Sequence, residues 1–263
     1  MQRYFLHIAY DGSNYRGWQR QADVCSVQET MENKLHKIFK HVVTIYGCGR
    51  TDAGVHASQY LLHINLPEPC SFDLKFRLNK NLPNNIIVHD VIPVKNRQHA
   101  RYDAISRTYN YFIHLEDDPI LSQYSSYYEC SDLNFERMQQ ATELLKTGSD
   151  FKHFCKQPHL FDDTTCQLSN AQLFVSVDQK RLQLTVTANR FLRGMIRIIV
   201  TCLLEIGTGK LSIAEFQSML KNKGEPSEKH PAHPNGLYLS KIEYPYLSIP
   251  EKGFICSLLK INN

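Results

Sequence analysis

The sequence predicts an α+β fold: two ferredoxin-like βαββαβ halves joined into one mixed, largely antiparallel sheet, with helices on one face and a cleft between the halves. Three observations lead to this prediction. Alternating apolar segments typical of strands are interspersed with segments of helical periodicity. The same order of elements occurs twice along 263 residues. No low-complexity linker separates the two copies, and a hydrophobic content of 42% is enough to form a sizeable core.

The first half begins with residues 4–10, whose alternating aromatic and branched side chains are typical of a strand. Ser26 and Glu29 have the spacing of a capping box, and the apolar residues that follow recur at helical spacing. Further strands are expected at 41–46, 58–65 and 86–92, and a short helix at 71–79.

The second half repeats this order from a strand at 107–115. A helix is expected next, with Phe135 and Met138 facing the core and its end at Gly148. The remaining expected elements are strands at 171–177 and 182–188, a long helix from about 190 to 206, a helix opened by a second capping box at Ser212 and Glu215, and a strand at 236–243. The segment 221–234 is the best candidate for a loop. We therefore expect an N-terminal half at 1–104, which contains the loop 47–57, and a C-terminal half at 105–263.

Composition excludes some classes of protein and leaves others open. The eight cysteines are scattered singly and form no C-x-x-C pair, which argues against a zinc site or a disulfide framework. The N-terminus lacks a secretory signal, and the longest apolar stretch is interrupted by arginines. We expect a cytoplasmic protein without a membrane span and without a metal. A net charge of +4 permits a polyanionic partner but does not identify one.

The loop from Gly47 to His56 is the strongest local signal. Three glycines in eight residues give the backbone unusual freedom, and Arg50, Thr51 and Asp52 lie in the bend. Taken alone, this is more often a tight turn in which the aspartate bonds its own backbone. Two further segments favour a functional interpretation.

The first segment is the strand at 107–115, where alternation places Arg107, Tyr109 and Tyr111 on one face. A tyrosine beside an arginine suits a nucleobase beside a phosphate, although an aromatic core face has the same pattern. The second segment is the helix expected from 190, where Arg190, Arg193 and Arg197 would form one basic stripe. Because that helix is otherwise apolar, a buried arginine on it needs an anionic partner.

At this point the residues are similar to those of a known family. The chain resembles the TruA family of tRNA pseudouridine synthases nearly end to end. The most specific match is GRTDAGVHA at 49–57. The other matching segments, in the order of the family, are YDGSNYRGWQRQ at 10–21, NLPNNI at 81–86, HARYDA at 99–104, SRTYNY at 106–111, GSDFKHFCK at 148–156, NRFLRGMIRIIV at 189–200 and GLYL at 236–239.

The resemblance implies the role of each matched residue. Asp52 would be the essential aspartate, Tyr109 the tyrosine that packs against the target base, Arg197 the arginine that pairs with the aspartate, and Arg50 the arginine that holds the flipped nucleotide. It also implies the modification of uridines 38, 39 and 40 in the anticodon stem-loop of tRNA, no cofactor or metal, and a homodimer whose basic cleft holds one tRNA. The chain departs from many relatives at Cys166-Gln167, which lack an arginine, and at Arg193-Gly194, where many have two histidines.

Residue chemistry leaves several points open. Asp52 would act at C1′ of the ribose, at C6 of the base, or on a ribose proton, and Tyr109 is one candidate for the base that accepts the C5 proton. The alternatives are the same chemistry on a different RNA uridine, a non-catalytic RNA-binding paralogue, and a hydrolase that releases uracil. The hydrolase ranks lowest because the three catalytic segments contain no second carboxylate.

Overall fold

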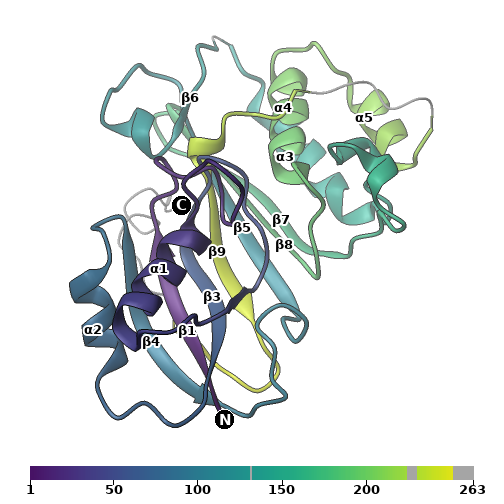
Figure 1. Cartoon of the computed structure of the whole chain (residues 1–263). Coiled ribbons are helices and arrows are strands. Elements are labelled where there is room, and N and C mark those ends of the chain that lie inside the picture. Colours follow the sequence, from purple (N-terminus) through teal and green to yellow (C-terminus); the bar gives the residue numbers. More distant parts are fainter. Residues whose placement is uncertain (131, 224–229, 251–263) are drawn as a thin grey trace. The chain divides into compact units, whose positions relative to one another are not determined.

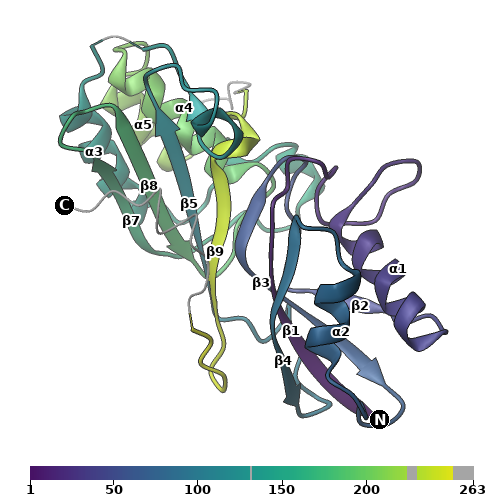
Figure 2. The same cartoon turned by 90° about the vertical axis from the view of Figure 1, so that its left-hand side faces the viewer.

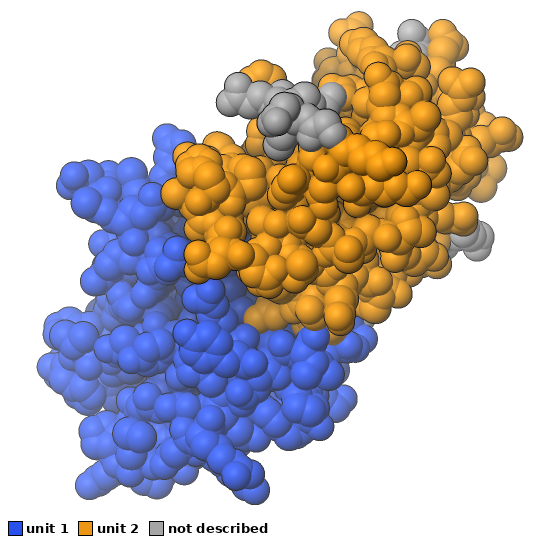
Figure 3. All heavy atoms as spheres, turned by 90° about the vertical axis from the view of Figure 1, so that its right-hand side faces the viewer, with its two compact units in different colours: residues 1–105, 238–258 blue, residues 106–237, 259–263 orange. Residues whose placement is uncertain are grey.

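The structure, a computed structural model, describes residues 1–130, 132–223 and 230–250. It divides into two compact units, which Figure 3 colours separately. Of the described residues, unit 1 contains 1–105 and 238–250, and unit 2 contains those between 106 and 237. The expected division into 1–104 and 105–263 stays a prediction. Part of the expected loop at 221–234 lies outside the described residues.

Unit 1 has a sheet in which β1 (Gln2–Tyr10) pairs antiparallel with both β3 (His56–Leu66) and β4 (Ile86–Val94). The other edge of β3 is shared by two strands. β2 (Ile45–Gly47) pairs antiparallel with residues 62–64, and β9 (Leu237–Glu243) pairs parallel with His56 and Ala57. The first residues of β3, where the glycine-rich loop ends, therefore lie between β1 and β9.

Two helices belong to unit 1. α1 (Val27–Phe39) begins at Ser26, whose hydroxyl accepts from the Glu29 amide, and it buries Val27, Met31 and Leu35. α2 (Leu74–Asn81) is capped in the same way by Asp73 and contacts β4. The two helices contact each other and lie on the same side of the strands (Figures 1 and 2). The predicted order βαββαβ is confirmed here, except that β2 is shorter than the strand expected at 41–46.

Unit 2 has its own antiparallel core of β5 (Ser106–His114), β8 (Arg181–Ala188) and β7 (Leu168–Val175), with the two-residue β6 (Ser126–Tyr127) parallel to β5. α3 (Phe135–Leu144) packs on β7 and on α4 (Met195–Gly207), and α5 (Ile213–Leu220) packs on α3. Figure 2 shows the three helices gathered together. α4 buries ten of its thirteen residues, and each large aliphatic side chain contributes about 1.5–3 kcal/mol on burial.

The predicted α+β class and the mixed, largely antiparallel pairing are confirmed. The second capping box is also confirmed, because the Ser212 hydroxyl accepts from the Glu215 amide while the Glu215 carboxylate accepts from the Ser212 amide. No helix among the described residues is long and apolar enough to cross a membrane.

Candidate active site

The loop from Gly47 to His56 joins β2 to β3 in unit 1. Its first residues are tied to β3, because the Cys48 amide donates to Leu61 O (2.8 Å) and the Tyr60 hydroxyl donates to Gly49 O (2.6 Å). Arg50 is exposed and Asp52 is half-buried. The Val55 amide donates to Asp52 O (3.2 Å), so the backbone turns directly after the aspartate.

Residues of the N-terminal motif hold Thr51, the neighbour of Asp52. The hydroxyls of Tyr10 and Thr51 are hydrogen-bonded at 2.8 Å in a buried position, and the Trp18 amide donates to Thr51 O (3.2 Å). Trp18 is 2% exposed and stacks on Tyr60 with ring centroids 4.0 Å apart. Trp18 is therefore a packing residue, and its backbone has a second role as a support of the loop.

Gly17 makes this approach sterically possible. Its φ is +92°, and a Cβ at this position would lie 2.5 Å from Thr51 O. Both the left-handed backbone and the close approach require glycine.

Asp11 and His56 form a buried polar contact at the other end of the loop. His56 Nδ1 lies 3.1 Å from Asp11 Oδ1, and the same nitrogen lies 3.1 Å from the Gly12 amide. The Ser13 amide and hydroxyl also donate to Asp11 Oδ1. The bond to His56, supported by those from Ser13, lowers the pKa of the Asp11 carboxyl to about 2.

Strand β5 of unit 2 carries the predicted Arg107, Tyr109 and Tyr111. Its pairing with β8 is regular from Arg107 opposite Ala188 to His114 opposite Arg181, so the three side chains share one face. Tyr109 is half-buried, and its ring meets Phe191 edge-on with centroids 4.9 Å apart. Arg107 donates to Asn189 O (3.1 Å).

Tyr111 is a core residue. It is fully buried, and its hydroxyl donates to His233 O (2.7 Å) and lies within hydrogen-bond distance of the Ser126 hydroxyl (2.9 Å). Burial raises the pKa of Tyr111 well above its ordinary value. The face of β5 is therefore an aromatic core at Tyr111 and becomes partly accessible at Tyr109 and Arg107.

Arg197 projects from the first turns of α4. Its Nε donates to Ala232 O (2.6 Å), and Ala232 in turn donates its amide to Arg197 O (3.0 Å). The positive charge of Arg197 acts on both Tyr111 and Tyr128, where it opposes the rise in pKa that burial causes. Arg197 is therefore fixed among the tyrosines of unit 2.

The predicted basic stripe is wrong, because Arg190 and Arg193 do not lie on the helix. α4 begins only at Met195, after Gly194 adopts a φ of +72°. A residue in the left-handed region cannot continue a right-handed helix, so the chain before it forms a loop. Of the three arginines, only Arg197 lies on α4.

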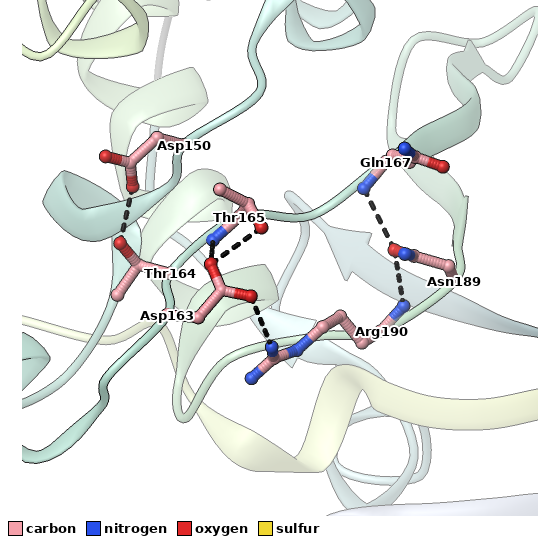
Figure 4. Close-up of polar contacts among 7 residues, drawn as sticks. All are labelled: Asp150, Asp163, Thr164, Thr165, Gln167, Asn189 and Arg190. Carbon is pink, nitrogen blue, oxygen red and sulfur yellow. Dashed lines mark hydrogen bonds and ion pairs between the residues drawn. The ribbon is translucent and has the colours of Figure 1, made fainter. Parts of the chain in front are cut away.

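Arg190 instead belongs to a polar network of residues in unit 2, which Figure 4 shows. Its guanidinium lies 3.1 Å from Asp163, whose carboxylate also accepts from the amide and hydroxyl of Thr165. The Asn189 side chain accepts from the amides of Gln167 and Arg190, which joins the two segments. Arg193 lies nearby in sequence and donates to Gln157 Oε1 (2.8 Å).

The structure shows the environment of Cys166 and Gln167, where the chain departs from many relatives. Cys166 is 1% exposed, and burial raises the pKa of its thiol to about 11. Gln167 is exposed and uses its backbone amide to reach Asn189. These two positions therefore serve packing and a backbone contact.

The predicted site residues fall into two groups. Arg50 and Asp52 lie in unit 1, and Arg107, Tyr109, Arg193 and Arg197 lie in unit 2. The pairing of Asp52 with Arg197 stays a prediction. Among the described residues, no group of three or more histidine, cysteine or acidic side chains is placed to hold a metal ion.

Sequence reasoning missed several residues that support the site. Asp11 is not among the predicted site residues, and the contact between Phe191 and Tyr109 depends on the loop before α4. The short motif at 10–21 was a usable signal, since its residues surround the Asp52 loop.

Comparison with known proteins identifies the family. The family model described as tRNA pseudouridine synthase matches residues 7–103 and 143–245, so the chain belongs to this family of isomerases. It is 38% identical over 250 residues to tRNA pseudouridine synthase A of Porphyromonas gingivalis, an alignment that covers 93% of this chain and 98% of the relative. It is 38% identical to the protein of that name from Bacteroides fragilis (93% and 97% covered) and 34% identical to that from Streptococcus gordonii (93% and 99% covered).

Proposed function

We propose that the protein isomerises uridine to pseudouridine at positions 38–40 of the tRNA anticodon stem-loop, with Asp52 as the essential carboxylate. The observation that carries this proposal is the support of Asp52. Its neighbour Thr51 is bonded by Tyr10 and Trp18, its own carbonyl accepts from Val55, and its side chain stays half-buried. A rigid backbone with an accessible carboxylate suits covalent or proton-transfer chemistry.

The substrate chemistry defines what the other residues must do. A uridine in a stem-loop has to be turned out before its glycosidic bond is accessible, and a flipped base needs a stacking partner. Tyr109 supplies the ring, with its orientation fixed by Phe191. Arg50, Arg107 and Arg193, together with Arg190, supply positive charge for the displaced backbone.

The reaction exchanges one bond for another within the same nucleotide. The N1–C1′ bond breaks, the uracil rotates, a C5–C1′ bond forms, and the proton on C5 is lost while N1 gains one. Attack of Asp52 on C1′, attack on C6, and removal of a ribose proton all require an ionised carboxylate. We propose that Arg197 pairs with Asp52 and keeps it in that form.

The enzyme acts in the cytoplasm, where tRNA is modified, and two copies of the chain bind tRNA as a homodimer. The number of copies is measured by light scattering of the protein with and without tRNA.

Release of tritium from tRNA labelled at uridine C5 tests the function, because only substitution at C5 frees this label. The wild type should release tritium, Asp52→Asn should release none above background, and both should bind tRNA with similar affinity because phosphate contacts dominate binding. Asp23→Asn, at an exposed aspartate of unit 1, is the matched control and should react like the wild type.

The alternatives give different products in the same assay. Binding without release by the wild type would indicate a non-catalytic paralogue, and free uracil would indicate a hydrolase. Release followed by mapping outside positions 38–40 would indicate a different target uridine.

A further inference from the structure

We propose that residues 10–18 are a clamp that holds the Asp52 loop in its reactive conformation, and that Asp11 and His56 are positioning residues which fasten it. This inference rests on the proposed function, since it concerns the same carboxylate. It assigns a role to two residues that the reaction itself does not require.

The clamp contacts the loop on both sides of Asp52. On the N-terminal side, Thr51 is bonded to the Tyr10 hydroxyl and to the Trp18 amide. On the C-terminal side, the Gly54 amide donates to Tyr15 O (3.2 Å). The aspartate is thus bracketed by bonds from a segment about forty residues earlier in the chain.

Gly12 lies against the same loop with no space for a side chain. A Cβ at Gly12 would lie 2.0 Å from Val55 O, an overlap with backbone that cannot be relieved by a rotamer change. The turn at Asp11 to Ser13 is therefore pressed against Val55 and His56. Its own geometry is set by the two bonds from Ser13 to Asp11.

His56 fastens this contact in either protonation state of its Nδ1. The nitrogen lies 3.1 Å from an acceptor, Asp11 Oδ1, and 3.1 Å from a donor, the Gly12 amide. With a proton on Nδ1 the ring donates to the carboxylate, and without one it accepts from the amide. The ring is 1% exposed and stacks on Tyr238 (centroids 4.6 Å apart), so it has little freedom to leave this position.

The clamp should affect catalysis because its contacts lie close to Asp52 along the chain. His56 is four residues after Asp52, and a displacement of about 1 Å at a catalytic group lowers a rate on the order of 100-fold. A loosened clamp would therefore slow the chemical step while leaving the phosphate contacts of tRNA unchanged.

The test compares Asp11→Asn and His56→Gln with a matched control in the same unit. His7 and Asp90 form a second histidine–carboxylate pair at 3.4 Å, with the histidine fully buried and the carboxylate 32% exposed, against 30% for Asp11. Asp90→Asn thus removes a comparable charge from a pair on β1 and β4, in which His7 lies opposite Leu61 of β3.

Two measurements are made on each protein. The first is amide hydrogen exchange of the peptide covering 49–57, which needs no substrate. The second is the single-turnover rate of tritium release at saturating tRNA, with the dissociation constant for tRNA measured in parallel.

We expect exchange of the loop amides to rise at least about 10-fold in both Asp11→Asn and His56→Gln, and the single-turnover rate to fall about 10- to 100-fold, with tRNA affinity within about 3-fold of the wild type. Asp90→Asn should change none of these. The double variant should be no slower than the slower single variant, because both substitutions break one contact.

The clamp would be overturned if the loop amides of Asp11→Asn exchanged at the wild-type rate. It would also be overturned if the folded Asp11→Asn variant released tritium at the wild-type single-turnover rate. If Asp11→Asn does not fold, Ser13→Ala loosens the same turn from an exposed position, and unchanged loop exchange in that variant would overturn the proposal equally. Inactivity of the wild type would count against the proposed function alone, since the exchange measurement judges the clamp without turnover.

Discussion

The guanidinium of Arg190 lies 3.1 Å from the carboxylate of Asp163, on a loop that ends where α4 begins. Both side chains are about half exposed, at 42% and 54%. An exposed pair of this kind contributes only about 0–1 kcal/mol to stability. The pair therefore leaves Arg190 available to exchange the carboxylate for a phosphate at little cost.

Arg190→Gln should weaken tRNA binding about 3- to 10-fold near physiological salt and reduce the slope of log K against log salt by about one. The reason is the loss of one phosphate contact. The control is Lys180→Gln, which breaks another exposed ion pair of unit 2, that with Glu116, and should leave the slope unchanged. Equal effects of both substitutions in filter-binding titrations would show that only net charge matters.

Tyr109→Leu should lower the single-turnover rate by about 10- to 100-fold, since stacking of a base on an aromatic ring contributes about 1–3 kcal/mol. Tyr109→Phe retains the ring and its contact with Phe191, so it should lose less. The difference between the two variants measures the contribution of the ring, and the difference between the wild type and Tyr109→Phe measures that of the hydroxyl. A wild-type rate for the leucine variant would remove Tyr109 from the site.

Arg197→Met should lower turnover at least about 100-fold, because the aspartate would lose its cationic partner. The substitution also removes the bond to Ala232 O, so a control for that segment is needed. Thr201→Val removes the bond from the same helix to His230 O (2.7 Å) and should leave turnover within about 3-fold. Near-normal activity of Arg197→Met would exclude an essential pair with Asp52.

Asp11 should make stability depend on acid pH. Its folded-state pKa of about 2 is below the ordinary value of 3.8, so its ionised form stabilises the fold at pH values above about 4. This contribution should be lost as the pH falls from about 4 to about 2. In urea unfolding, the stability difference between wild type and Asp11→Asn should be constant near pH 6 and shrink over that range. A difference that is independent of pH would contradict the lowered pKa.

Local patterns in the sequence determined most of the secondary structure and the identity of the candidate site. Helix starts at Ser26 and Ser212 were predictable because a capping side chain and the amide that it accepts from are only three residues apart. Strands β1, β4, β5 and β9 were predictable because alternation is a local property. The glycine-rich loop around Asp52 was identifiable because glycine allows more backbone conformations than any other residue.

Two predictions made from local patterns were wrong, because periodicity alone does not reveal a left-handed residue or the extent of strand pairing. The apolar pattern from 190 onward continues through Gly194, but the left-handed backbone there ends the periodicity and moves Arg190 and Arg193 into a loop. Residues 41–44 (HVVT) contain the β-branched side chains typical of a strand, yet in the segment 41–47 only residues 45–47 pair with β3.

Only the tertiary structure decided what surrounds the Asp52 loop. The sequence by itself determined that Asp52 lies in a glycine-rich bend, that Tyr109 shares a face with Arg107, and that the chain resembles one family. Folding decided that Tyr10, Asp11, Gly12 and Trp18 fix that bend, and that Phe191 orients Tyr109. The physical reason is that these contacts join segments about thirty to eighty residues apart, and a hydrogen bond or a steric limit between distant residues leaves no periodic trace in either segment.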